Sequence, residues 1–465
     1  MKQEITAWMW DGKSFNGQAG QGAPREYLAV WSRTAAKHKL KGKAGETTLV
    51  LDGPSPSILL GIRAEDTGRA VYEGAIRAVE IARKHRFAAL RIGGVPSSAH
   101  LAAIRGGHDG QYSFRIGRKK SAAPIKVRVS GASAAVVRRA GIIGDAVTFA
   151  RNLVNTPPGE KYPARLAARI IEELKRAKAA GGSVTMEIWD ERKLAREKCA
   201  GVLAVGQGSS RPPRIVRMNY HPRGARRHIA LVGKGVTFDA GGLNIKTFEG
   251  MKTMKCDMSG AAAVAAAFSA IVRLKLPVRV SAIIGLAENM LGGGAFKPGD
   301  VVTMRSGRTV EILNTDAEGR IVLGDLLDIM AKSKADCVVD LATLTGACLV
   351  ALGEETAGLF ANDDALAKKI SSAGATVGEM YWRLPLGRDY LAKLKGDISD
   401  LKNIGGRYGG SCTAAQFLQE FIGDRKWAHL DIAGPAFREG SSSGRPGGAT
   451  GFGTATLVEL VGELA

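Results

Sequence analysis

The 465-residue sequence predicts an α/β protein of two domains, a smaller N-terminal α/β domain and a larger one with a central, mostly parallel sheet flanked by helices. Three observations predict this class. Short apolar, β-branched runs alternate with helical stretches along the chain. The later strand candidates are almost continuously apolar, as strands are when helices cover both faces of a sheet. Two prolines interrupt the pattern in NTPPG at 155–159.

The first part of the chain contains four short runs typical of strands and three stretches typical of helices. The strands are expected at Thr47–Leu51, Ile58–Ile62, Phe87–Ile92 and Ile125–Val129, and the helices at Thr67–His85, Ser97–Arg105 and 132–154. Pro157 and Pro158 lack the N–H that a continuing helix needs. We therefore place a domain boundary there, which gives domains of residues 1–150 and 151–465.

The second part opens with an amphipathic helix, in which Leu166, Ile170 and Leu174 recur at a spacing of four. Apolar runs then predict strands at Val184–Trp189, Ile215–Tyr220, Ile229–Val232, Val280–Leu286, Val310–Leu313, Cys337–Leu341 and Ala428–Ile432. Helices are expected at Gly260–Leu276, Ile321–Ala331 and Thr413–Ile422. Ligands of such sheets gather at the carboxyl ends of the strands, so residues that follow each strand are the candidates for a site.

Composition excludes several classes of protein. With 45% hydrophobic and 24% charged residues, the chain is neither a disordered tail nor a membrane bundle. Its longest apolar stretch, Gly260–Val272, is shorter than the roughly 18 residues of a spanning helix. Because no apolar run follows the start MKQE, we expect no signal peptide. Five scattered cysteines without a CxxC pair indicate a reduced, cytoplasmic protein. We expect no membrane partner.

The net charge of +22 is unevenly distributed. Residues 1–150 hold 24 Lys and Arg against 11 Asp and Glu, a net +13. The local concentrations are Lys37, Lys39, Lys41 and Lys43, and then Arg115, Arg118, Lys119 and Lys120. Such a basic domain can attract nucleic acid without reading its sequence, or it can be a solvated face.

Three polar clusters lie near the ends of predicted elements, and the first and third of them directly follow predicted strands. They are GKGVTFDAGG at 233–242 with Lys246 beyond it, MKCDMSG at 254–260, and NTDAEGR at 314–320. The last two open predicted helices. Together they supply four carboxylates and several cations, all expected on glycine-rich turns at the ends of elements.

Four carboxylates in one pocket raise each other's pKa unless cations neutralise them. Salt bridges to Lys and Arg are one way, and divalent ions such as Zn, Mn, Mg or Co are the other. Taken singly, Asp239 and Asp257 can be helix caps, and Asp316 and Glu318 can stabilise a helix N-terminus. The glycines suggest a nucleotide loop, but neither GxGxxG nor GxxxxGK[ST] occurs at these turns.

The segments are more informative in combination. GKGVTFDAGGLNIK, MKCDMSGAAAV and NTDAEGRIVLGD closely resemble blocks of the leucyl aminopeptidase family, the two-metal cytosolic exopeptidases. NTPPGEKYP, DLATLTGAC, GGSCTAAQFL and WAHLDIAG are similar to further blocks, in the family's order. The resemblance is dense between about residues 228 and 452 and thin before residue 150. It covers the expected catalytic domain.

The resemblance implies a role for each matching residue. The metal ligands would be Lys234, Asp239, Asp257, Asp316 and Glu318. Of these, Asp239 and Glu318 would bridge two ions. Lys234 and Asp257 would complete the tighter site, and Asp316, with its own carbonyl, the exchangeable one.

Five further positions match functional positions of the family. Lys246 and Arg320 match its catalytic residues, and Met254, Thr343 and Gly346 match the pocket for the first substrate side chain. Lys246 would polarise the scissile carbonyl, as an oxyanion donor does. The implied cofactors are two divalent ions per subunit, Mn or Zn, with Mg or Co as alternatives at the exchangeable site, and a bicarbonate at Arg320.

The implied activity is removal of an N-terminal Leu, Met or similar residue from peptides with a free N-terminus, in a cytoplasmic homohexamer of two trimers. The alternative is a DNA-binding or regulatory protein on an aminopeptidase scaffold, for which the basic N-terminal domain speaks. A catalytically dead homologue conflicts with the intact ligand set. A different two-metal hydrolase, such as a phosphatase, would more often recruit histidines.

Overall fold

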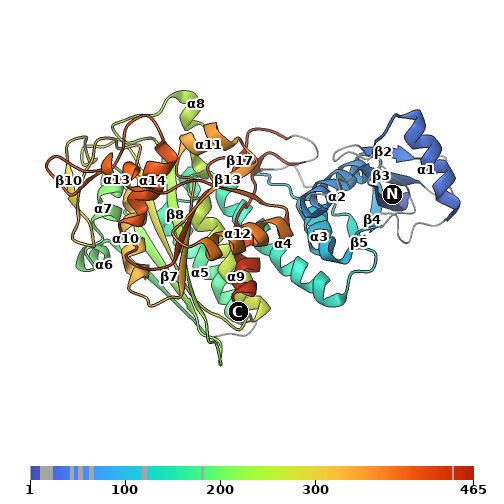
Figure 1. The fold of residues 1–465 in the computed structure, drawn as a ribbon, viewed down its shortest axis with the longest axis horizontal. Helices are drawn as coiled ribbons and strands as arrows, with labels where there is room; N and C mark the ends of the chain where they lie inside the picture. Colours follow the sequence, from blue (N-terminus) through green and yellow to red (C-terminus); the bar gives the residue numbers. More distant parts are fainter. Residues whose placement is uncertain are drawn as a thin grey trace. The chain divides into compact units, whose positions relative to one another are not determined.

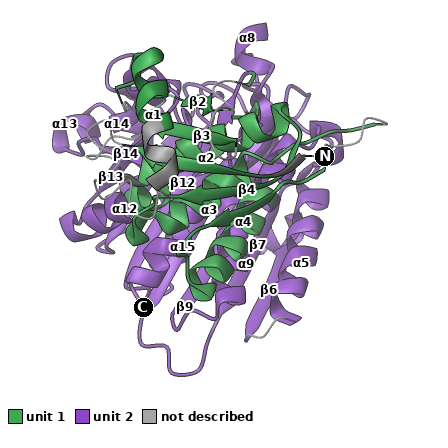
Figure 2. Cartoon of the chain, turned by 90° about the vertical axis from the view of Figure 1, so that its right-hand side faces the viewer, with its two compact units in different colours: residues 1–148, 374–379, 440–447 green, residues 149–373, 380–439, 448–465 purple. Residues whose placement is uncertain are grey.

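The computed structural model describes residues 2–10, 25–41, 47–50, 56–61, 67–117, 123–179, 183–441 and 445–465. The chain divides into two compact units (Figure 2). Unit 1 comprises Met1–Thr148, Gly374–Glu379 and Gly440–Gly447, and unit 2 comprises Phe149–Ala373, Met380–Glu439 and Gly448–Ala465. The predicted α/β class is confirmed. The separate roles expected for the two domains stay a prediction.

Unit 1 contains a five-stranded sheet in the order β2-β3-β1-β4-β5. Its strands are β1 (Lys2–Trp10), β2 (Thr47–Val50), β3 (Ser57–Gly61), β4 (Phe87–Gly93) and β5 (Lys126–Val129). All neighbours are parallel except β2 and β3. The helices are α1 (Arg25–Lys37), α2 (Thr67–Lys84) and α3 (His100–Asp109), with α4 (Ala134–Asn155) running across the division between the units.

The central strand of this sheet, β1, was not predicted. Its polar start, KQE, hides the alternation that follows, in which Ile5, Ala7 and Met9 are buried. These side chains share one core with Val71 and Ala75 of α2. The hydrophobic periodicity is therefore present, but only over the second half of the strand.

Unit 2 contains an eight-stranded sheet in the order β14-β13-β16-β12-β8-β9-β7-β6. Figure 1 labels β7, β8 and β13 of this sheet. Its strands are β6 (Val184–Trp189), β7 (Arg214–Tyr220), β8 (His228–Asp239), β9 (Arg279–Asn289), β12 (Cys337–Ala342), β13 (Thr356–Ala361), β14 (Met380–Arg383) and β16 (Trp427–Asp431). The centre, β16-β12-β8-β9, is parallel, and β6, β7 and the β13–β16 pair are antiparallel. Small sheets are formed by β10 (Val301–Thr303), β11 (Thr309–Glu311) and β15 (Leu401–Lys402), and by β17 (Phe437–Arg438) and β18 (Gly448–Ala449).

The helices of unit 2 were predicted in part. Those expected near 166–174, 260–276, 321–331 and 413–422 are α5 (Pro163–Ala179), α9 (Ser259–Leu274), α10 (Gly319–Ala331) and α14 (Gly410–Gln419). Helices that the sequence analysis did not predict are α6 (Glu191–Arg196), α7 (Ala200–Gly206), α8 (Phe248–Met251), α11 (Gly346–Leu352), α12 (Asp364–Val377), α13 (Arg388–Ala392) and α15 (Thr454–Glu463).

Helices α9 and α10 cover opposite faces of the sheet at strand β8. A Cβ on Gly233 would lie 2.8 Å from the Cα of Ala261 in α9. The neighbouring residue, Lys234, reaches the start of α10, where a Cβ on Gly319 would lie 2.6 Å from its Cε. Successive residues of a strand point to opposite faces, so the two helices sandwich this strand.

Helix α9 belongs to a long apolar helical stretch. By length and composition, Phe248–Leu274 could cross a membrane, which the shorter apolar run Gly260–Val272 does not predict. However, 89% of its most apolar window is buried inside the structure. The stretch therefore behaves as a core helix, packed on β8, β9 and β12.

One expectation about β8 was wrong. The predicted strand ended at Val232, and Lys234 and Asp239 were assigned to a glycine-rich turn. The strand continues to Asp239. Gly233 and Gly235 lie within the strand and do not form a turn. A Cβ on Gly233 would lie 2.8 Å from the backbone of α9, and a Cβ on Gly235 would lie 2.6 Å from the backbone of β9. The glycines therefore allow these backbones to approach closely.

Candidate metal centre

Five acidic and basic side chains meet where β8 ends and where α9 and α10 begin. Lys234 and Asp239 project from β8, and Asp257 lies between the 3-10 turn Met254–Cys256 and α9. Asp316 and Glu318 directly precede α10. The five side chains that the sequence singled out thus lie close together at the carboxyl-terminal half of a parallel strand, which is where sites of such sheets form.

Lys234 lies between two carboxylates. Its Nζ is 2.8 Å from Asp257 Oδ1 and 2.9 Å from Glu318 Oε1, and it donates to the carbonyl of Thr343 at 2.9 Å. Only 3% of its side chain is exposed. Burial lowers the pKa of Lys234, but the surrounding carboxylates outweigh burial and raise it above its ordinary value. In the absence of metal the side chain is therefore an ammonium.

Lys246 lies between the other two carboxylates. Its Nζ is 2.9 Å from Asp239 Oδ2 and also pairs with Asp316. Burial lowers its pKa too, and the carboxylates again raise it further than burial lowers it. The two lysines thus divide the four acids into two pairs.

Hydrogen bonds fix the orientation of Asp239 at the end of β8. Its Oδ1 accepts from the side chain of Asn289 at 2.8 Å and from the backbone N–H of Gly241 at 2.9 Å. Asn289 ends the neighbouring strand β9 and also donates to the carbonyl of Thr315. One amide therefore connects Asp239 to the loop that carries Asp316.

Thr343 and Asp431 position the loop after β12. The Thr343 hydroxyl donates to Asp257 Oδ1 at 2.8 Å. Asp431, fully buried at the end of β16, accepts from the N–H of Leu344 at 3.1 Å and from the hydroxyl of Thr345 at 2.7 Å. Neither Asp431 nor Asn289 was predicted from the sequence, because their partners are distant in sequence.

The carboxylates remain incompletely neutralised by these lysines. Burial raises the pKa of Asp257 to about 6, although Lys234 opposes the rise. Burial, and then the charge of Asp239, raise the pKa of Glu318 to about 8. The pKa of Asp316 is also raised by burial and by Asp239. Additional positive charge would stabilise the ionised form of all three groups.

The arrangement has the donors that a metal centre needs. Ligand oxygens of Asp239, Asp316 and Glu318 lie within 4.8 Å of one another. Asp257 Oδ2 is buried and accepts no hydrogen bond from any residue that the structure describes. Asp316 Oδ1 and Glu318 Oε1 are near lysines, but the geometry of those contacts is that of ion pairs rather than of hydrogen bonds. Buried acceptor oxygens without donors fit divalent cations.

The remaining predicted residues lie around this cluster. Arg320 is in the first turn of α10, is 7% exposed and donates to the carbonyl of Asn403 at 2.7 Å. Burial lowers its pKa to about 10, so it is charged at neutral pH. Met254 is half-buried on the turn before Asp257. Gly346 begins α11 with open space in front of its Cα.

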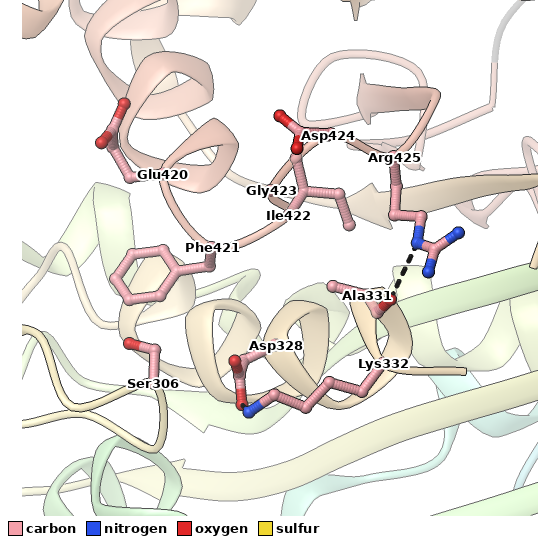
Figure 3. A pocket seen from close by; sticks show the side chains of 10 residues that line it. All are labelled: Ser306, Asp328, Ala331, Lys332, Glu420, Phe421, Ile422, Gly423, Asp424 and Arg425. Carbon is pink, nitrogen blue, oxygen red and sulfur yellow. Dashed lines mark hydrogen bonds and ion pairs between the residues drawn. The ribbon is translucent and has the colours of Figure 1, made fainter. Parts of the chain in front are cut away.

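A cavity of about 590 Å³ lies elsewhere in unit 2 and contains none of these residues. It is lined by Ser306, Asp328, Ala331, Lys332, Glu420, Phe421, Ile422, Gly423, Asp424 and Arg425 (Figure 3). Several of the charged side chains that line the cavity are paired with other groups of the protein. Lys332 pairs with Asp328 at 2.9 Å, and Arg425 donates to the carbonyl of Ala331 at 3.0 Å.

The basic clusters of unit 1 are described in part. Lys37, Lys39, Lys41 and Arg115 are exposed. Lys43, Arg118, Lys119 and Lys120 lie outside the described residues. Four of the eight predicted cations are therefore on the surface of unit 1.

Comparison with known proteins gives one consistent family. The cytosol aminopeptidase family, catalytic domain, matches residues 148–458. A probable cytosol aminopeptidase of Rhodopirellula baltica is 41% identical, over 97% of this chain and 90% of its own length. One of Gluconobacter oxydans is 42% identical, over 92% and 89%.

Solved structures agree. The bottromycin maturation enzyme BotP in complex with Mn has a TM-score of 0.86 at 33% identity, covering 100% of this chain and 99% of its own. A mutant of tomato leucine aminopeptidase has a TM-score of 0.85 at 29% identity, covering 99% and 94%.

Proposed function

The chain belongs to the cytosol aminopeptidase family and is an aminopeptidase, and we propose on that premise that it removes Leu, Met or a similar first residue by means of two divalent ions. The ions would be held by Lys234, Asp239, Asp257, Asp316 and Glu318. Asp239 and Glu318 would bridge them, Lys234 and Asp257 would complete one site, and Asp316 with its carbonyl the other.

One observation carries the proposal: four buried or half-buried carboxylates converge with too little positive charge among them. Asp257 Oδ2 is buried and accepts no hydrogen bond from any described residue, and the buried oxygens Asp316 Oδ1 and Glu318 Oε1 contact lysines only as ion pairs. Lys234 would have to lose its proton to become a ligand, as metal-binding amines do. Its Nζ already lies 2.8 Å and 2.9 Å from the two acids that would share that ion.

The chemistry of the ions fits peptide hydrolysis. When bound, two divalent ions lower the pKa of water and stabilise the charge that develops on the substrate. Mn or Zn is proposed for both positions, with Mg or Co at the exchangeable site. The structural neighbour BotP in complex with Mn supports manganese.

Lys246 and Arg320 would act as cations around the reacting group. Lys246 is 14% exposed, so its ammonium can reach a substrate carbonyl and stabilise the oxyanion that forms there. Arg320 would hold a bicarbonate, a weak base when bound. Its Nε is buried and donates to no described residue, which leaves a donor for an anion.

Substrate choice follows from the acidic cluster and the proposed pocket. A free N-terminal amine can carry positive charge or donate a lone pair to a metal, and acylation removes both properties. Met254, Thr343 and Gly346 would contact the first side chain. The half-buried thioether of Met254 offers an adaptable apolar wall, which suits Leu and Met.

Leucine p-nitroanilide tests this function. We expect hydrolysis with Mn or Zn present, loss of hydrolysis after chelation, and recovery when the metal is restored. N-acetyl-leucine p-nitroanilide should not be turned over, because its nitrogen is an amide. Equal turnover of both compounds would refute the proposed mode of binding.

A second candidate function, nucleic-acid binding by unit 1, is favoured by the exposed cations Arg33, Lys37, Lys39 and Lys41 on and after α1. It uses a different surface from the aminopeptidase centre. A homohexamer of two trimers and a cytoplasmic location are proposed from the family alone.

A further inference from the structure

Lys161 is a fully buried lysine that no described carboxylate neutralises. It follows the 3-10 turn Pro158–Glu160 and is 0% exposed. Its Nζ donates to the carbonyls of Val154 and Lys255, each at 2.5 Å, and approaches that of Leu153 at 3.4 Å. Met258 Sδ lies 3.6 Å away. All of these residues belong to unit 2.

A buried ammonium without a counter-ion is costly to the fold. Burial lowers the pKa of Lys161 to about 7, which shows how poorly the site replaces water around the charge. An apolar side chain of similar length would avoid this cost. Residues that lower the stability of the fold occur mainly at functional sites. The contacts of the Lys161 side chain are therefore expected to serve the function of the protein.

The ammonium connects two segments of chain about a hundred residues apart. Leu153 and Val154 lie in the last turn of α4, whose final carbonyls have no partner within the helix and carry partial negative charge. Lys255 lies in the turn Met254–Cys256. The Lys255 ammonium in turn approaches the carbonyl of Asn155 at 3.5 Å. The end of α4 and this turn are thus joined twice.

The turn that Lys161 holds contains one residue of the proposed site and leads directly into another. Asp257 directly follows it, and Met254 begins it. Asp257 is also held by Lys234 and by the Thr343 hydroxyl, each at 2.8 Å, but those contacts act on its carboxylate. Lys161 and the Ser259 hydroxyl, which donates to the carbonyl of Cys256 at 2.5 Å, act on the backbone of the turn.

We propose that Lys161 is a positioning residue, whose amino group fixes the turn Met254–Cys256 against the end of α4 and so presents Asp257 to the proposed metal centre before an ion binds. The inference rests on the proposed metal centre. It assigns to Lys161 an effect on metal affinity that is separate from any effect on folding. Residues that orient metal ligands typically change affinity by about 10- to 100-fold when replaced.

The test is a calorimetric titration of the metal-free protein with Mn²⁺. Lys161→Met keeps the length and apolar stem of the side chain and removes the three donors. We expect the dissociation constant of the tighter Mn²⁺ site to rise about tenfold or more, and activity to recover when Mn²⁺ is raised to saturation. A dissociation constant within about twofold of the wild type would overturn the inference.

Two control variants separate positioning from general damage. Ser281→Ala removes buried hydrogen bonds to His228 and Asn219 near the opposite end of the sheet, and should lower the melting temperature while leaving Mn²⁺ affinity unchanged. Lys255→Met removes the long contact to Asn155 and the approach of the ammonium to the Phe437 ring, 5.8 Å from its centre, and keeps the backbone carbonyl that Lys161 holds. It should bind Mn²⁺ within about twofold of the wild type. If both controls weaken Mn²⁺ binding as much as Lys161→Met, positioning by Lys161 is wrong.

Two measurements on the wild-type protein complete the test. If that protein binds no Mn²⁺, the proposed function fails, whereas tight binding by both wild type and Lys161→Met refutes this inference alone. Should Lys161→Met not fold, hydrogen exchange of the metal-free wild type decides. The amides of Cys256 and Asp257, which donate to Thr253 and Met254, should be protected without metal. Exchange at the rate of an unstructured segment would contradict a preformed turn.

Discussion

Lys234 and Lys246 are twelve positions apart, and each pairs with two carboxylates. Their surroundings nevertheless differ. Lys234 is 3% exposed and enclosed by Asp257, Glu318 and the Thr343 carbonyl, whereas Lys246 is 14% exposed. The enclosed lysine is suited to bind a metal, and the more accessible one is suited to contact a substrate.

Replacing each lysine separately distinguishes these roles. Lys234→Ala removes a proposed ligand and should lower metal content and activity together. Lys246→Ala should retain two ions per chain while the turnover number falls by roughly a hundredfold or more, the scale of losing one oxyanion donor. The Michaelis constant should change little, since this contact strengthens mainly in the transition state.

Elemental analysis and steady-state kinetics on the two variants are the measurements. Loss of metal by Lys246→Ala, or full activity of that variant, would mean that the roles of the two lysines are assigned wrongly.

At the scale of elements, the sequence predicted the buried strands well and the ends of elements less well. Apolar runs such as 184–189 correspond to β6 without error. Strand β8 was cut short because glycine is typical of turns, and only the closeness of α9 and β9 explains Gly233 and Gly235. No local pattern carries that information, because the neighbouring backbones are distant in sequence.

The residues of the candidate site, too, could be predicted only in part. Its acids and lysines could be predicted because they occur in short segments that resemble a family's blocks. Asn289 and Lys161 could not, since each acts on a partner far along the chain: Asn289 on Asp239, and Lys161 on the carbonyl of Lys255. Asp431 was missed for the same reason.

Helix α10 contains a matched pair of glycines. A Cβ on Gly319 would meet Lys234 at 2.6–2.8 Å, whereas one on Gly324 would meet the flexible end of Met304 at 2.9 Å. Gly319→Ala should therefore displace Lys234 and lower Mn²⁺ affinity and activity. Gly324→Ala should leave both unchanged, and its helix propensity, worth about 0.5–1 kcal/mol, should offset the shift of Met304.

Calorimetry with Mn²⁺ and thermal melting of the two variants make the comparison. Unchanged Mn²⁺ affinity in Gly319→Ala would show that the position of Lys234 is not limited by its contact with α10.

At the scale of the whole molecule, charge and the division into units matter most. Unit 1 recruits Gly374–Glu379 and Gly440–Gly447 from late in the chain. A single boundary read from the prolines could not predict this, because such segments carry no signal of the unit that they join. The uneven charge, in contrast, could be read directly from the sequence.

The basic surface of unit 1 leads to a prediction about nucleic acid. If Lys37, Lys39 and Lys41 contact phosphates, the logarithm of the affinity for duplex DNA should fall linearly with the logarithm of the salt concentration. Replacing the three lysines with Gln should make that slope shallower and leave peptidase activity unchanged. Fluorescence anisotropy at several salt concentrations measures it, and no binding of wild type at low salt would leave the charge as a solvated face.

The central claim is that Lys234, Asp239, Asp257, Asp316 and Glu318 form a two-metal centre. The most direct measurement is anomalous X-ray diffraction from crystals of the protein grown with Mn²⁺. The account predicts two anomalous peaks per chain, both in contact with Asp239 and Glu318. A single peak, or peaks only at another acidic group such as Asp328 and Glu420 of the cavity, would contradict it.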